Sequence, residues 1–321
     1  MLRNTARIVD LAPETVSFRD AVLYGLARTP KSIPPMYFYD TRGSELFEAI
    51  CALPEYYPTR AETEILQVHA EDIAARIGSA AHLIEYGSGA TQKVRPLLDA
   101  LDAPVAYTPI DISGEHLDGA AQRLAKAHPG IEVTAIVADY LRPFSVPVPR
   151  RPVGRRAALF LGSTIGNFAP DEALVFLRQA ARRLAGGGCL LLGADLRKDP
   201  ARLHAAYNDA AGVTAQFNLN LLTRINRELC GDFDVDSFAH YAFYNPLPGR
   251  IEMHLVSRRT QRVTVAGRSF VFGEGESIHT ENSHKFTVEG LQDLARRAGF
   301  EPEHVWFDRD RLFSLHLLLA P

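Results

Sequence analysis

The apolar run that ends at Ile84 is followed by Glu85, Tyr86 and then Gly87-Ser88-Gly89, and this junction constrains the fold more than any other feature of the chain. An apolar run that ends at two spaced glycines is typical of a buried strand that opens into a ligand-binding turn. Glycine is required where the backbone takes positive φ or approaches a ligand closely. A Gly-x-Gly pair alone fits a plain strand-to-helix turn equally well, so other parts of the sequence must decide.

Strand and helix patterns alternate on both sides of this turn. A helix pattern covers 62–77, where Thr59 and Glu62 have the spacing of a capping box. Five strands joined by helices are expected near 82–86, 105–110, 131–138, 157–161 and 189–192. This order predicts an α/β fold with a doubly wound, Rossmann-like parallel sheet.

The C-terminal region predicts a strand that runs against the others. A helix around Leu291, Leu294 and Ala295 is followed by a strand over 303–307, a polar turn over 308–311 and a strand over 312–319. So short a turn joins only antiparallel neighbours, so the last strand should be antiparallel.

Between 197 and 285 the pattern changes to two helices, alternating strands around Ile251, Met253 and Leu255, and a hairpin centred on Gly267. We expect this segment to be an inserted α+β lobe. The predicted domains are therefore a cofactor-binding domain formed by 61–196 and 286–321 and a substrate-binding domain formed by 1–60 and 197–285.

The residues around the glycine turn favour S-adenosylmethionine as the cofactor. Asp111 ends the strand over 105–110, where a carboxylate can bind the two hydroxyls of a ribose. Gln92 stands where a dinucleotide-binding loop would have its third glycine, which disfavours an NAD-dependent oxidoreductase. Glu85, two residues before the first glycine, suits a cofactor with a cationic amino-acid tail.

Two further polar segments follow predicted strands at the same sheet edge. Asp139 and Tyr140 follow the third strand, where they can contact adenine, although Asp139 fits a simple cap equally well. The fourth strand ends in 162–167, which contains two glycines, two hydroxyls and Asn167. Asn167 also has a structural alternative, as a cap for a helix that begins near Pro170.

Composition narrows the possible partners. The formal net charge is -3, so no global positive field attracts nucleic acid, and the basic cluster at 150–156 reads as a solvated loop. Cys51, Cys189 and Cys230 are too few and too far apart for a disulfide framework. No secretory or membrane-spanning segment is evident. We expect a cytoplasmic monomer that binds neither nucleic acid nor membrane.

The chain resembles a known family over nearly its whole length. The matching segments are 31–35, 37–40, 53–60, 162–167, 207–214, 226–229 and 251–253. They are similar to those of the S-adenosylmethionine-dependent histidine Nα-methyltransferases, which form hercynine for ergothioneine biosynthesis. The resemblance implies three methyl transfers to the α-amine of L-histidine.

The resemblance also implies roles for particular residues. The residues implied to contact the cofactor are Tyr39, Gly87, Lys93, Asp111, Asp139 and Tyr140. Those implied to bind the substrate are Phe47, Tyr56, Gly162, Thr164, Asn167, Tyr207, Met253, Glu281 and Ser283. Tyr39, Tyr56 and Asn167 are the implied catalytic residues. The chain departs from the family pattern at 90–92 and at Asn282 and His284, which flank Ser283 and are expected to make the pocket more polar.

Methyl transfer from a sulfonium needs positioning of the amine more than it needs a metal. We expect no metal, since His279 and His284 are expected to lie in a loop or at the rim of the pocket rather than to chelate a metal together. Glu281 is expected to select histidine by accepting an imidazole N–H. The alternatives are methylation of another amino acid such as a tryptophan derivative, methylation of a macromolecule, and metabolite binding without turnover. The segment 244–247 only faintly resembles the motif of amino-directed DNA methyltransferases.

Overall fold

The computed structural model describes residues 5–11, 16–88, 93–112, 114–142 and 144–321. The chain divides into two compact units. The first comprises Ala61–Leu196 and Phe286–Pro321 together with the N-terminal segment that holds the first strand, and the second comprises Val16–Arg60 and Arg197–Lys285. Among the described residues, no helix is long and apolar enough to cross a membrane.

The first unit is built on an eight-stranded sheet in the order β1-β5-β4-β3-β6-β7-β14-β13. The bounds of the strands are β1 Arg7–Asp10, β3 Ala81–Tyr86, β4 Ala106–Asp111, β5 Glu132–Val137, β6 Arg155–Phe160, β7 Gly188–Asp195, β13 Glu301–Phe307 and β14 Phe313–Ala320. Strands β1 to β7 of this sheet pair in parallel, whereas β14 is antiparallel to both β7 and β13. The doubly wound sheet with an antiparallel last strand is thus confirmed.

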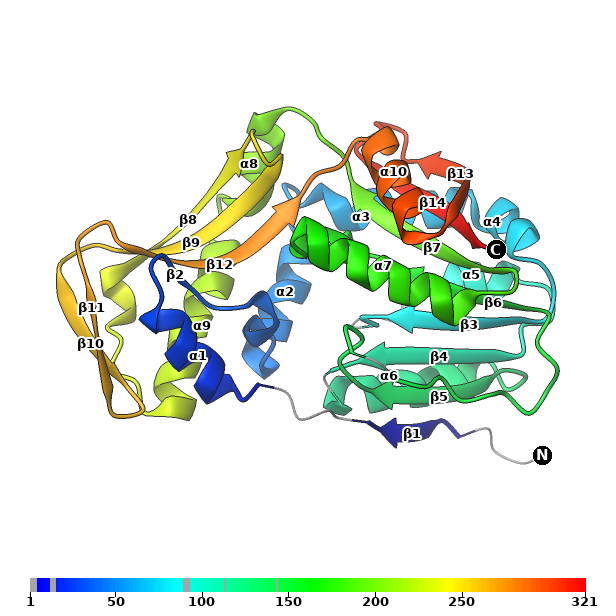
Figure 1. Cartoon of the computed structure of the whole chain (residues 1–321), viewed down its shortest axis with the longest axis horizontal. Helices are drawn as coiled ribbons and strands as arrows, with labels where there is room; N and C mark the ends of the chain where they lie inside the picture. The colour runs from blue at the N-terminus through cyan, green and yellow to red at the C-terminus, as the bar shows by residue number, and fades with distance from the viewer. Residues whose placement is uncertain (1–4, 12–15, 89–92, 113, 143) are drawn as a thin grey trace. The chain divides into compact units, whose positions relative to one another are not determined.

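Helices cover both faces of this sheet. One face packs against residues of α3 (Tyr57–Val68), α4 (Ala70–Ile77), α5 (Arg95–Ala100) and α6 (Gly114–Ala127), which form one buried cluster with Leu83 and Leu159. The other face packs against α7 (Pro170–Leu184) and α10 (Val288–Ala298), which are drawn in front of the strands in Figure 1. The apolar strands are therefore buried on both sides, as parallel strands usually are.

The N-terminal assignment was wrong in one respect. Residues 1–60 were expected to belong together to the substrate lobe, yet β1 pairs in parallel with β5, register Arg7 to Thr134, in the first unit. This strand is four residues long and largely exposed, and it lies at the edge of the sheet. Its backbone hydrogen bonds to β5, rather than an apolar side-chain pattern, determine its place.

The second unit contains a four-stranded sheet in the order β2-β12-β9-β8. Its strands are β2 Lys31–Ser32, β12 Ser277–His284, β9 Arg250–Ser257 and β8 Phe238–Asn245, and the hairpin is β10 Gln261–Val265 with β11 Arg268–Phe272. Its helices are α1 Phe18–Ala27, α2 Thr41–Ala52, α8 Pro200–Tyr207 and α9 Val213–Leu229. The predicted two helices, strands and hairpin of the insert are confirmed.

Strand alternation separates the two faces of this sheet. In β9, Ile251, Met253 and Leu255 are fully buried, while His254 between them is only partly buried. In β12 a bulge between His279 and Glu281 shifts the register against β9, so that His279 lies opposite His254 and Glu281 opposite Met253. This register determines which side chains share a face.

Candidate active site

The glycine turn after β3 leaves space for a ligand. Gly87 has φ +70°, and its N–H donates to the Ile110 carbonyl at 2.8 Å. A methyl group at Gly87 would lie 3.9 Å from Cε1 of Tyr140. The neighbouring Ser88 hydroxyl is buried and has no hydrogen-bond partner among the described residues. A buried hydroxyl without a partner beside an open glycine is what a bound polar group would satisfy; Gly89 and Gln92 lie outside the described residues.

Asp111, Asp139 and Tyr140 lie at the carboxyl edge next to this turn. The Tyr140 hydroxyl is kept protonated because burial, and then the charges of Asp111 and Asp139, raise its pKa. The Tyr140 ring packs against Tyr86 and Phe160 at centroid distances of 6.0 and 5.8 Å. Asp139 accepts from the Leu141 N–H at 2.9 Å, so it also has the capping role considered as its alternative.

A carboxylate that the sequence pattern misassigned supports the same edge. Glu62 is fully buried, and its two oxygens accept from the Gly162 N–H at 2.7 Å and from Lys93 Nζ at 3.1 Å. The capping-box prediction is wrong because α3 begins at Tyr57, which places Thr59 and Glu62 inside the helix. Gly193 makes room, since a methyl group there would lie 2.4 Å from Glu62 Oε1. The ion pair positions Lys93 beside the loop that follows β6.

Glu85, at the end of β3, has a partner inside the protein. The Tyr107 hydroxyl donates to its carboxylate. Burial raises the pKa of Glu85 to about 7, while the Tyr107 hydrogen bond and the Lys93 charge act in the opposite direction. Burial thus favours the protonated form of Glu85.

The loop after β6 holds Asn167, whose side-chain amide is half-buried. Gly162 and Ser163 both have positive φ, and the Thr164 hydroxyl donates to the Leu161 carbonyl at 2.9 Å, which fixes the turn. The half-buried Asn167 side chain makes no hydrogen bond to any residue that the structure describes. It is not the N-cap of α7, because Ala169 holds that position and its own N–H donates to Glu172 in the first turn.

In the second unit, four aromatic rings follow one another. The Tyr39 ring lies 5.7 Å from that of Phe47, Phe47 lies 6.4 Å from Tyr56, and Tyr56 lies 6.2 Å from Tyr207. All three contacts are edge-to-face, the geometry that aromatic quadrupoles favour. Burial, and then the nearby Tyr207, Cys51 and Glu281, raise the pKa of the Tyr56 hydroxyl well above its usual value.

Hydrogen bonds from motif residues hold these rings in place. Asp40, next to Tyr39, caps α2 by accepting from the Gly43 N–H at 2.7 Å and also accepts from Asn220 and Arg227 of α9 at 2.9 and 2.6 Å. Arg60 donates to the carbonyls of Leu53, Pro54 and Tyr56, so it fixes the turn that presents the Tyr56 ring.

Two polar residues at the end of β12 and just after it contact the Tyr207 hydroxyl, which donates to Ser283 Oγ at 2.8 Å. Lys285 Nζ, also buried, donates to both oxygens at 3.1 and 2.8 Å. Burial raises the pKa of the Glu281 carboxyl to about 7, and the Lys285 charge opposes this shift. The buried Met253 lies directly opposite Glu281 on β9. We did not predict a role for Lys285 from the sequence. Its position two residues after Ser283 of the proposed pocket is the signal that could have identified it.

The expectation that Asn282 and His284 make the pocket more polar was wrong. Neighbouring residues of a strand point to opposite faces, and Asn282 faces away from Glu281 and Ser283. Asn282 Oδ1 lies 2.9 Å from His279 Nε2, on the other side of the sheet. His284 shares the face of Asn282 by the same alternation.

Comparison with known proteins decides the family. The profile described as histidine-specific methyltransferase, S-adenosylmethionine-dependent, matches residues 18–320. The chain belongs to this family. The histidine N-alpha-methyltransferases of Mycolicibacterium smegmatis and Mycobacterium tuberculosis are each 44% identical to it, over 94% of both chains. Ergothioneine biosynthesis protein 1 of Neurospora crassa is 32% identical over 90% of this chain and 33% of its own length.

The proposed site residues of this histidine-specific methyltransferase are divided between the two units. The structure places Gly87, Lys93, Asp111, Asp139, Tyr140, Gly162, Thr164 and Asn167 in the first unit. It places Tyr39, Phe47, Tyr56, Tyr207, Met253, Glu281 and Ser283 in the second. In the first unit these residues lie at the carboxyl edge of the sheet. In the second unit they lie along the series of aromatic rings and on β9 and β12. The candidate residues thus form one cluster around the glycine turn of the first unit and an aromatic, acidic cluster in the second.

Proposed function

We propose that this methyltransferase transfers methyl groups from S-adenosylmethionine to the α-amine of L-histidine, three times, to form hercynine for ergothioneine biosynthesis. The observation that carries the proposal is the buried Glu281 carboxyl, together with Ser283 and its hydrogen-bond partner Tyr207. Glu281 and Ser283 lie on the face of β12 opposite to Asn282 and His284, the residues that depart from the family pattern. The mycobacterial relatives, named for this activity, support it.

The first unit has the features that S-adenosylmethionine needs. The cofactor supplies an electrophilic methyl group on a sulfonium. The open side of Gly87 and the unpartnered Ser88 hydroxyl would receive polar groups of the cofactor, and Asp111 would accept from the ribose hydroxyls. Asp139 and Tyr140 would contact the adenine, and Lys93, held by Glu62, would face the same edge. Tyr39 is also assigned to the cofactor.

The tyrosines are assigned to orienting the amine rather than to removing its proton as bases. The raised pKa of Tyr56 keeps its hydroxyl neutral near pH 7, so it can donate or accept a hydrogen bond but does not act as a tyrosinate. The α-amine is mostly protonated near pH 7, so its proton must be lost to water before the nitrogen attacks the methyl group. The rings of Tyr39 and Tyr56 stabilise the growing alkylammonium by cation–π attraction. Asn167, whose amide has no bond to described residues, is assigned to the amine and carboxylate.

Glu281 is assigned to side-chain recognition. A buried carboxylate that accepts an imidazole N–H is satisfied by histidine and left unpaired by an aliphatic or phenyl side chain. An unpaired buried polar group costs about 1–3 kcal/mol, more when it is charged, which is enough to discriminate strongly between amino acids. Met253 opposite Glu281 would pack against the imidazole plane.

The direct test is mass spectrometry of products after the purified protein is incubated with S-adenosylmethionine and each amino acid in turn. Histidine alone should be converted, with successive additions of one, two and three methyl groups. Conversion of tryptophan or its derivatives in place of histidine would support the alternative substrate. Incorporation of labelled methyl only into nucleic acid or protein, or binding of histidine without turnover, would overturn the proposal.

We also propose that the protein acts as a cytoplasmic monomer without nucleic-acid partners. The three cysteines, all within the described part of the chain, form no disulfide, which suits a reducing compartment. Sedimentation velocity with and without both substrates tests the monomer, and cell fractionation tests the compartment.

A further inference from the structure

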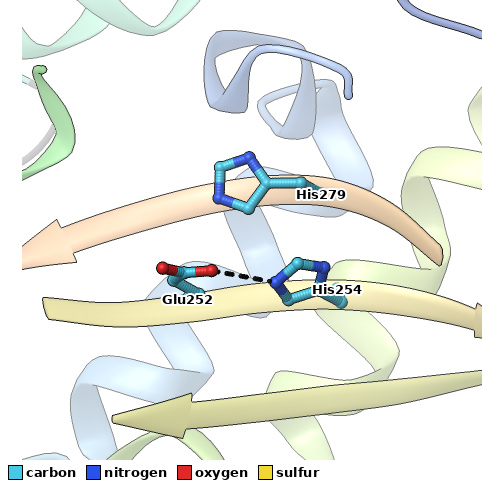
Figure 2. A group of neighbouring side chains, drawn as sticks. All are labelled: Glu252, His254 and His279. Atoms are coloured by element: carbon cyan, nitrogen blue, oxygen red, sulfur yellow. Dashed lines mark hydrogen bonds and ion pairs between the residues drawn. The ribbon is translucent and has the colours of Figure 1, made fainter. Parts of the chain in front are cut away.

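One face of the second unit's sheet carries two histidines and a carboxylate close together. Glu252 and His254 lie two residues apart on β9, and His279 lies directly opposite His254 on β12. Figure 2 shows the Glu252 carboxylate and the two imidazole rings on these neighbouring strands, with the Glu252–His254 interaction drawn as a dashed line. One carboxylate oxygen and one nitrogen from each ring all lie within 4.8 Å of one another.

We propose that Glu252, His254 and His279 bind a zinc-class divalent cation on this face. Two imidazoles and one carboxylate, with a further position for water or another oxygen, form a donor set typical of Zn²⁺. In a tetrahedral site with metal–ligand bonds of about 2.0–2.2 Å the ligand atoms lie roughly 3.4 Å apart, so the most distant pair of these atoms needs to approach by up to about 1.4 Å. Side-chain rotation provides such a movement without a change in the strands.

The surrounding residues orient the proposed ligands. Ser277 Oγ lies 3.2 Å from His254 Nδ1, so it can accept the Nδ1 proton and leave the Nε2 lone pair directed towards Glu252 Oε2, 3.3 Å away. The other oxygen of Glu252 is occupied, because Asn245 and Arg250 donate to Oε1 at 3.0 and 2.9 Å. The carboxylate is thus fixed with one oxygen left for the cation.

Asn282 and Phe243 complete the surroundings. Asn282 lies opposite Glu252, and its Oδ1, 2.9 Å from His279 Nε2, is available as a fourth ligand or as a partner that orients the ring. Phe243 stacks on His254 with a centroid distance of 5.7 Å. Burial lowers the pKa of both His254 and His279, which favours the neutral imidazole that a metal requires. The nearby Arg250 charge opposes a cation, so binding should be weaker than at a structural zinc site.

The proposed site departs from the expectation of a metal-free chain, but it takes no part in methyl transfer. Met253, between Glu252 and His254, and Glu281, after the bulge, point to the opposite face of the same two strands. A cation bound by residues of β9 and β12 would therefore link these strands behind Met253 and Glu281. The physical effect expected is stabilisation of this sheet.

The test is titration of the chelator-treated full-length protein with ZnCl₂. Binding is measured by calorimetry, and its effect on stability is measured by thermal unfolding. We expect one Zn²⁺ per chain and a higher Tm in its presence. His254→Ala and His279→Gln should each weaken binding at least tenfold, as should Glu252→Gln, which keeps the residue's size. Circular dichroism without metal checks that each variant folds.

His304→Ala is the matched control, since this partly exposed histidine belongs to the first unit and should leave binding unchanged. Binding that survives all three ligand substitutions, binding that His304→Ala abolishes, or no binding by the wild-type protein would overturn the proposal. None of these readouts depends on methyltransferase activity.

Discussion

Lys285 Nζ lies 3.1 Å from the Tyr207 hydroxyl, so a buried ammonium fixes the orientation of a proposed substrate-binding tyrosine. An ammonium only donates, so the Tyr207 oxygen accepts from Lys285 while its proton goes to Ser283 Oγ at 2.8 Å. The backbone of Lys285 is itself held, since its N–H donates to the Gly249 carbonyl at 2.8 Å. Lys285 is a positioning residue by this geometry.

Lys285→Met should raise the KM for histidine more than it lowers kcat. The change removes the donor to Tyr207 and Ser283 and also removes the charge that opposes the upward pKa shift of Glu281. A charged hydrogen bond contributes about 1.5–3 kcal/mol, so kcat/KM should fall roughly 10- to 100-fold. The acidic limb of the pH–rate profile should move to higher pH.

Lys285→Arg, which keeps the charge, should keep the acidic limb near its wild-type position. Steady-state kinetics across pH 6–9 measure both effects. A Lys285→Met profile that keeps the wild-type limb would contradict the positioning role.

Glu281→Ala should weaken the use of histidine and relax the choice of side chain. The carboxylate is buried, and its loss removes the proposed partner of the imidazole N–H. We expect kcat/KM for histidine to fall about tenfold or more, with a smaller change for tryptophan and phenylalanine. Competition assays with paired amino acids measure the ratio. Glu274→Ala, at an exposed position of the same unit, is the control and should match the wild type.

Gly87→Ala should weaken S-adenosylmethionine binding at least tenfold. Both the positive φ and the added methyl group, 3.9 Å from Tyr140, affect the space assigned to the cofactor. Gly78→Ala is a matched control, because Gly78 also has positive φ but its methyl group would meet nothing within 4 Å. Both variants should lose stability from backbone strain, about 1–3 kcal/mol each. Calorimetric titration separates them, and equal cofactor affinity in the two variants would argue against the proposed site.

Glu85→Gln should remove part of the pH dependence of stability. The folded pKa of Glu85, about 7, lies above the ordinary glutamate value of 4.5, so the native state binds more protons between these values. Stability contributed by the protonated form is therefore present below about pH 4.5 and is lost as pH rises towards 7. The free energy of unfolding of Glu85→Gln relative to wild type should rise by up to about 3 kcal/mol between pH 5 and 8. Urea unfolding at several pH values checks this, and parallel curves would contradict it.

The sequence predicted the parallel sheet because its strands are short apolar runs followed by helical periodicity. The apolar residues of β3 and β7 are buried on both faces, so no other arrangement would hide them. It did not predict β1, whose residues Arg7–Asp10 are mostly exposed and show no apolar alternation. An edge strand held by backbone hydrogen bonds leaves little trace in side-chain pattern.

Glu62 and Asn282 show why parts of the candidate site were missed or misplaced. The spacing of Thr59 and Glu62 matches a cap, but the partner of Glu62 is a backbone N–H one hundred residues away in sequence, which no local pattern contains. Asn282 is adjacent in sequence to Glu281 but lies on the opposite face of β12. Adjacency in sequence thus predicts the correct strand for Asn282 but the wrong face of that strand.

The position of the transferred methyl groups tests the central claim most directly. Purified protein should be incubated with L-histidine and S-adenosylmethionine carrying a ¹³C methyl group, and the product examined by NMR and tandem mass spectrometry. The account predicts three equivalent labelled methyl groups on the α-nitrogen and an unmodified imidazole ring. Label on a ring nitrogen, or histidine recovered unlabelled from folded protein that binds both compounds, would contradict it.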